Sequence, residues 1–153
     1  MLISSDDYPT DEKRYYLFAF SLFISIGMIL SLLFGKTNYK DFLIGTFVAA
    51  SAFISSFLAI VPNILALQTI HYIFVVLMFS TIFTDNYGII LVSFLTVVIL
   101  QMLWYKFGSC MMFREGESWS MEMPQNISAF MWTIILGYKL LKFRNNTITE
   151  NKA

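Results

Sequence analysis

The feature that most constrains this chain is a run of 43 consecutive residues, from Phe42 to Thr84, without a single Asp, Glu, Lys or Arg. As one helix this run would measure about 64 Å at 1.5 Å per residue, roughly twice the thickness of a bilayer's hydrocarbon core. Pro62 interrupts the run near its middle, and proline both lacks a backbone donor and disfavours helical angles at the preceding Val61. The run therefore predicts a hairpin of two membrane-spanning helices that turns at Pro62-Asn63.

The composition supports this interpretation and excludes several functional classes. Of the 153 residues, 58% are hydrophobic and 13% are charged, with a mean hydropathy of +0.68, which leaves too few charges to coat a soluble core. The ten basic and ten acidic residues cancel, and the basic ones are scattered, so we expect no nucleic-acid partner. Cys110 is the only cysteine, which excludes an internal disulfide and a paired-thiol redox site.

The remaining apolar stretches complete an all-α integral membrane protein, a bundle of about five transmembrane helices in one domain. Residues 1–14 form a polar tail with four acidic and two basic residues, unlike the start of a secretory signal, so we expect the first span to be a retained anchor. The predicted spans are residues 15–34, 42–61, 64–83, 88–105 and 127–141, with a surface loop at 106–126 and a polar tail at 144–153.

The predicted span at 42–61 carries a stripe of small residues at steps of four, three, four and three. The stripe consists of Gly45, Ala49, Ala52, Ser56 and Ala59. Small side chains let helix backbones approach closely in lipid, where burial of apolar surface gains little. We interpret the stripe as the packing face for a neighbour, the first span, through Ser21 and Ser25. The alternative is a narrow pathway lined by hydroxyl groups.

His71, the only histidine, lies within the predicted span 64–83, and ionisable residues inside membranes are functional candidates by default. The alternative is a neutral imidazole that hydrogen-bonds a neighbouring helix. One histidine cannot supply two haem ligands, and a histidine-based metal site would need several chains. We therefore predict neither a cofactor nor a metal.

The predicted loop at 106–126 holds Cys110 and the acidic residues Glu115, Glu117 and Glu122 among several methionines. Thiolate and thioether ligands would select Cu(I), and paired carboxylates could act as acid and base. Flexible packing explains the methionines, and a solvated loop surface explains the glutamates.

The topology follows from the distribution of basic residues between the two sides of the membrane. Five spans place the tails on opposite sides, with four basic residues on the side of the amino tail and six on the side of the carboxyl tail. Because basic residues accumulate on the cytoplasmic side, this count places the carboxyl tail there.

Residues 70–117 resemble a family of small multi-span membrane proteins from large DNA viruses of algae and protists. That family is in turn similar to a bacterial membrane family of unknown function. The shared pattern is a helix that opens with His71, a polar turn, a helix that ends in Trp104, and then Cys110 followed by acidic residues. The helix that opens with histidine reads Ile70-His71-Tyr72-Ile73-Phe74-Val75-Val76-Leu77.

Three positions depart from the pattern of that family. The family carries threonine and glutamate at the third and sixth positions after the cysteine, where this chain has Phe113 and Gly116. A second histidine that often precedes the family's tryptophan is replaced by Leu103. The resemblance implies a protein of a viral membrane and supplies no established activity.

Three functional hypotheses follow. The first is a structural or interaction role in a viral or virus-modified membrane, either the internal membrane of the virion or a host endomembrane. Its partners would be the bilayer, further copies of the chain, or other viral membrane or capsid proteins. The second is a small oligomeric channel or carrier whose path is lined by Ser51, Ser55, Ser56 and His71. The third is a membrane enzyme.

The enzyme hypothesis uses His71, Cys110 and either Glu115 or Glu117. It requires these residues and Trp104 to meet at one membrane face, since catalytic partners must reach hydrogen-bond distance directly or through one water. We assign no catalytic residue and treat this cluster as a candidate functional site.

Overall fold

The computed structural model describes residues 11–61, 63–107 and 124–150, and in these ranges the chain is helical and contains no strand. The all-α prediction is therefore confirmed. The elements are α1 (Asp11–Phe34), α2 (Tyr39–Ile60), α3 (Ile64–Ser80), the short 3-10 helix η2 (Thr81–Phe83), α4 (Tyr87–Phe107) and α5 (Pro124–Glu150).

Four helical segments in the described part of the chain are long and apolar enough to cross a membrane. They are Asp11–Phe34, Tyr39–Ile60, Leu65–Phe83 and Tyr87–Phe107. The fifth predicted span is also helical, but it is not among these four. Its charge-free part ends before Lys139, and 15 residues from Pro124 to Tyr138 measure only about 22 Å at 1.5 Å per residue. The chain is thus a multi-pass membrane bundle with four clear spans and a more polar fifth helix.

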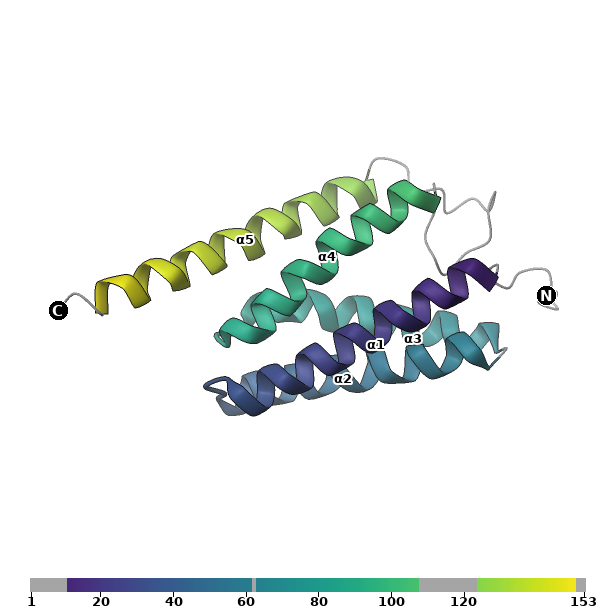
Figure 1. The fold of residues 1–153 in the computed structure, drawn as a ribbon, viewed down its shortest axis with the longest axis horizontal. Coiled ribbons are helices and arrows are strands. Elements are labelled where there is room, and N and C mark those ends of the chain that lie inside the picture. The colour runs from purple at the N-terminus through teal and green to yellow at the C-terminus, as the bar shows by residue number, and fades with distance from the viewer. Residues whose placement is uncertain (1–10, 62, 108–123, 151–153) are drawn as a thin grey trace.

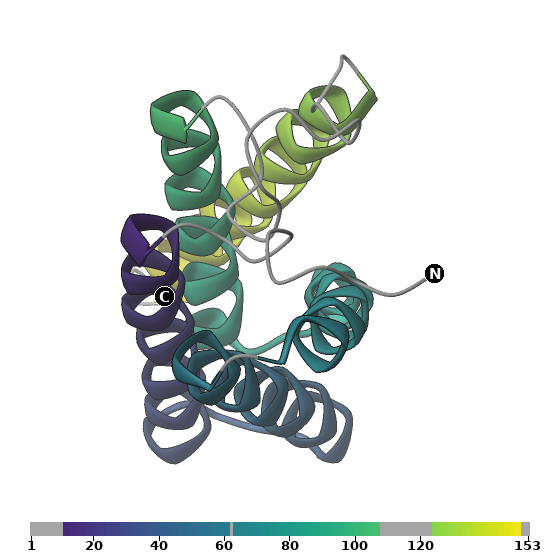
Figure 2. The same cartoon turned by 90° about the vertical axis from the view of Figure 1, so that its right-hand side faces the viewer.

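The helices are arranged around α1 and α4 (Figures 1 and 2). α1 packs along α2 and also against α4, while α5 packs against α4 and α3 packs against α2. The carboxyl-terminal half of α5 projects beyond the other helices. α3 stands on the side of the bundle opposite to α1 and α4.

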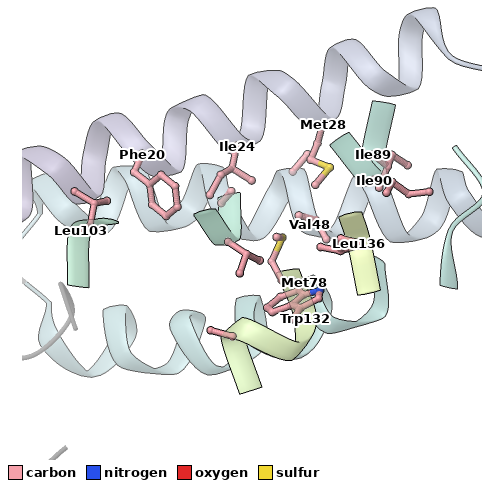
Figure 3. Close-up of a cluster of buried hydrophobic side chains, with 14 residues drawn as sticks. Phe20, Ile24, Met28, Val48, Met78, Ile89, Ile90, Leu103, Trp132 and Leu136 are labelled. Atoms are coloured by element: carbon pink, nitrogen blue, oxygen red, sulfur yellow. The ribbon is translucent and has the colours of Figure 1, made fainter. Parts of the chain in front are cut away.

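Side chains from all five helices meet in the main core (Figure 3). Ile24 and Met28 of α1 are buried with Val48 of α2, Met78 of α3 and Leu136 of α5. Ile89, Ile90 and Val97 bring α4 into the same cluster. In lipid these contacts stabilise the bundle through close packing, because the surrounding acyl chains are themselves apolar.

Asparagine side chains begin three of the helices. Asn38 accepts a hydrogen bond from the backbone N–H of Asp41 at 2.9 Å, and Asn63 accepts one from Ala66 at 3.0 Å. Asn86 accepts one from Ile89 at 3.1 Å. These N-caps satisfy donors that the first turn of a helix leaves without a partner, and so the polar turns of the sequence fix where α2, α3 and α4 start.

The helices extend beyond the spans expected from hydropathy. α1 begins within the predicted tail at Asp11, because Asp11 and Glu12 favour a first turn. At the two ends of the predicted loop 106–126, Lys106 and Phe107 belong to α4, and residues 124–126 belong to α5. α5, expected to be the shortest span, is the longest helix, since it continues through the predicted carboxyl tail to Glu150. Pro62 lies outside the described residues, but α2 ends and α3 begins on either side of it.

Candidate functional site

A small cavity at the centre of the bundle contains His71. Its volume is about 60 Å³, and each of the five helices contributes a side chain with a hydrogen-bonding group to its lining. These side chains are Ser21 of α1, Ser55 of α2, His71 of α3, Thr96 of α4 and Trp132 of α5. This volume is large enough to hold a few water molecules.

The surface of this cavity is nonetheless almost entirely apolar. The hydroxyl of Ser55 donates to the carbonyl of Ser51 on its own helix at 2.9 Å, and Thr96 donates to Val92 at 2.8 Å. Such bonds within a helix turn the polar atoms away from the cavity. The cavity surface therefore offers few hydrogen-bond partners to a water molecule.

His71 lies two turns into α3 and is partly buried at the edge of this cavity. Its ring centroid lies 5.9 Å from that of the adjacent Tyr72, with the two rings tilted by 56°. His71 and Ser55, two members of the predicted pathway, therefore line one cavity. The other two predicted members do not line it: Ser51 donates to Val48 at 3.0 Å and Ser56 donates to Phe53 at 2.7 Å.

Two tryptophans bury their indole nitrogens. Trp132 is 6% exposed, lines the cavity and stacks on Phe79 with ring centroids 4.2 Å apart. Trp104, near the end of α4, packs against the main core. Neither indole N–H has a hydrogen-bond partner among the described residues. The stacking of Trp132 on Phe79 joins α5 to α3.

Only part of the predicted functional cluster can be placed. Trp104 does not line the cavity that contains His71. Cys110, Glu115 and Glu117 lie outside the described residues. The convergence of these five residues, and with it the enzyme hypothesis, stays a prediction.

The stripe of small residues on α2 is buried along its length. Gly45, Ala49, Ala52, Ser56 and Ala59 are all buried. A Cβ atom at Gly45 would lie 2.9 Å from Leu32 Cδ2 of α1 and 3.1 Å from Ile89 Cδ1 of α4. Ser21 and Ser25 of α1 are also buried. This side of α2 therefore faces the interior of the bundle.

Several structural polar contacts could not be anticipated from the chain alone. Gln101 of α4 donates to the hydroxyl of Thr133 of α5 at 2.7 Å. Arg14 donates to the carbonyls of Ala59 and Ile60 at 2.9 and 2.7 Å. A polar amide in an otherwise apolar span is the one sequence signal that singles out Gln101, because such a group needs a partner on another helix.

The charged ends of the bundle carry two further sets of contacts. Lys106 pairs with Glu12 at 2.7 Å and lies over the ring of Tyr16, 3.9 Å from its centroid. At the other end Lys139 donates to the carbonyls of Ile82 and Thr84, both at 2.6 Å. These contacts tie α1 to α4, and α5 to the segment that follows α3.

Comparison of this chain with protein-family models, with curated proteins and with solved structures gives no match.

Proposed function

We propose that this protein has a structural or interaction role in its membrane. The observation that carries the proposal is the use of its polar side chains. Arg14, Asn86, Gln101 and Lys139 each bind a group on another helix or on the turn beyond it. Charged and amide groups at or within a membrane are costly unless they are paired. In this chain they hold the helices in one arrangement.

The cavity at His71 supports the same role. A space of about 60 Å³ with an apolar surface is far below the roughly 300–1,000 Å³ of pockets that enclose organic ligands. The hydroxyl groups of Ser51, Ser55 and Ser56 are bonded to their own helix. These features suit packing better than catalysis or transport.

An interaction role is testable by photo-crosslinking from the lipid-facing surface. Val76 on α3 is 69% exposed, and Phe47 on α2 is 56% exposed. A photoreactive amino acid at each site, in the full chain and its native membrane, should give discrete protein adducts from at least one face. Adducts with lipid alone from both faces would contradict an interaction role.

We also propose a viral or virus-modified membrane as the setting, with further copies of the chain or viral membrane or capsid proteins as partners. This part rests on the resemblance of residues 70–117 to the viral family. Crosslinking and mass spectrometry of purified particles and of infected-cell membranes test it. Absence of the protein from both would contradict the viral setting and leave the structural role standing.

A second candidate function is a small oligomeric channel or carrier. It is favoured by one observation, that Ser55 and His71 line the same cavity together with Ser21 and Thr96. Proteoliposomes of wild type and His71→Ala should then differ in ion or proton flux, with Tyr72→Ala as the matched neighbour. An absence of flux, or a flux unaffected by His71→Ala, would favour the structural role.

A further inference from the structure

A groove of about 430 Å³ lies at the end of the bundle where α1 finishes and α4 begins. One part of its lining is apolar and aromatic: Leu30 and Phe34 of α1, Tyr87 of α4 and Phe143 of α5. The rings of Tyr87 and Phe143 meet edge to face with centroids 6.2 Å apart. The other part is polar and includes Lys36 and Asp85. The groove therefore joins an apolar wall to a charged rim.

The position of the groove matches the boundary between acyl chains and headgroups. Phe34 is the last residue of α1 and is 84% exposed, while Tyr87 is the first residue of α4 and is 51% exposed. Both helices are membrane spans by length and composition. Aromatic rings collect at this depth, and a lysine just beyond the span lies among the headgroups.

The charge at this end of the bundle favours an anion. Among the described residues it carries five basic residues against three acidic ones, an excess of two, whereas the opposite end has an excess of one. The basic residues are Lys36, Lys40, Lys139, Lys142 and Arg144, and the acidic ones are Asp41, Asp85 and Glu150.

Pairing within the bundle leaves Lys36 available to a ligand. Asp85 is neutralised by Lys40 at 3.0 Å, and Lys139 binds backbone carbonyls. Asp41 accepts a hydrogen bond from the backbone N–H of Asp85 at 3.1 Å. Lys36 is exposed at the groove and forms no ion pair within the described ranges.

We propose that this groove binds an anionic phospholipid, with Lys36 at the headgroup phosphate and an acyl chain along Leu30, Phe34 and Phe143. The lysine ammonium is a compact charge that suits a phosphate oxygen. The exposed apolar wall suits an acyl chain rather than a free phosphate ion. This inference depends on the chain lying in a membrane and not on the structural role proposed above.

Native mass spectrometry of the full chain in detergent tests the proposal. The protein is incubated with equal amounts of palmitoyl-oleoyl phosphatidylglycerol and phosphatidylcholine, and the bound copies of each lipid are counted. We expect preferential binding of phosphatidylglycerol. Lys36→Gln should weaken that binding about fivefold, which corresponds to about 1 kcal/mol for one basic residue near an anionic surface.

Two controls separate the groove from general surface charge. Lys106→Gln removes a lysine at the opposite end and should leave the binding of phosphatidylglycerol unchanged. Phe34→Ala removes part of the apolar wall and should weaken binding of the lipid, whereas Phe47→Ala, an exposed phenylalanine on α2, should not. Circular dichroism of each variant shows whether the bundle is intact.

The outcomes that would overturn the proposal are specific. Equal binding of both lipids, or equal losses in Lys36→Gln and Lys106→Gln, would show that the groove does not select an anionic headgroup. Displacement of the lipid by millimolar inorganic phosphate would show an anion site without a lipid component. A dimer that persists in place of bound lipid would assign the groove to a second copy of the chain.

Discussion

Asn86 offers the sharpest test of how the bundle is held together, because it is 1% exposed and binds in two directions. Its side-chain oxygen caps α4 by accepting from the N–H of Ile89 at 3.1 Å. Its amide nitrogen donates to the carbonyls of Ser31 and Lys36 and to the hydroxyl of Thr37 at 3.1 to 3.3 Å. One side chain thus starts α4 and ties it to the end of α1.

The cap at Ile89 and the bonds to the end of α1 together predict how much stability Asn86→Ala removes. Loss of an N-cap costs about 1 kcal/mol. Loss of the buried donor weakens the bonding of several acceptors and costs about 1–3 kcal/mol more. We therefore expect the free energy of unfolding to fall by about 2–4 kcal/mol. Asn63→Ala is the matched control, since Asn63 caps α3 in the same way but is exposed, and it should cost only about 1 kcal/mol.

Asn86→Asp separates the two functions of the side chain. A carboxylate still accepts from the N–H of Ile89 and suits the start of a helix, but it offers no donor to the carbonyls of Ser31 and Lys36. We therefore expect Asn86→Asp to lose most of the roughly 1–3 kcal/mol that the buried amide donor of Asn86 contributes. The measurement is unfolding in mixed micelles by titration with sodium dodecyl sulfate, followed by circular dichroism. Equal costs for Asn86→Ala and Asn63→Ala, within about 0.5 kcal/mol, would refute the tie between α1 and α4.

Three further changes test the packing and pairing of the helices, each by the same unfolding measurement. Gly45→Leu should destabilise the bundle by about 1–3 kcal/mol through overpacking, whereas Gly45→Ala should cost less, because the atom it approaches is the flexible end of Leu32. Gln101→Leu should cost about 0.6–2 kcal/mol by removing the bond to Thr133 between α4 and α5. Lys139→Met keeps an unbranched side chain that is one atom shorter but removes two bonds from a charged donor, and should cost about 1.5–3 kcal/mol.

Each of these three has an outcome that would contradict it. A stable Gly45→Leu protein would mean that the stripe on α2 does not pack closely. An unchanged Gln101→Leu protein would mean that the amide finds an equivalent partner in the less folded state in the membrane. An unchanged Lys139→Met protein would mean that other donors, such as water at the membrane edge, satisfy the two carbonyls.

The hairpin and the helical class could be predicted from the sequence, because both follow from a local property. The absence of charge over residues 42–84 requires membrane helices, and Pro62 places the break between them. The ends of the helices could not be predicted as well. Hydropathy marks where a helix leaves the hydrocarbon core, whereas Asp11 and Asn38 show that helices start in the polar region beyond it. α5 shows the same effect at its carboxyl-terminal end.

The residues that line the central cavity are brought together by tertiary packing, so they could be predicted only in part. His71 stands out in any sequence as a lone ionisable residue in a span. Thr96 and Trp132 do not, because threonine and tryptophan are common in membrane helices and only their position in the fold brings them to His71. The bond of Gln101 to Thr133 likewise depends on how α4 and α5 are aligned.

The charge-free run also explains why Arg14 and Lys139 bind backbone carbonyls at the ends of other helices. Neither α2 nor α3 has a basic residue in its last turn, so neither can supply a positive charge to its own terminal carbonyls. Arg14, which precedes the run, binds the carbonyls of Ala59 and Ile60 at the end of α2. Lys139, which follows it, binds those at the end of η2, at the opposite end of the bundle.

The donors for the hairpin therefore come from the helices on either side of it. From the sequence alone, Lys139 would be assigned to the membrane surface by snorkelling. Its ammonium group instead satisfies a helix end that has no donor of its own. The end of α1 also lacks a basic residue, and there the amide of Asn86, rather than a cation, donates to the carbonyl of Ser31. The sequence shows which helix ends lack a donor of their own, but the side chain that satisfies each of them depends on which helices pack together.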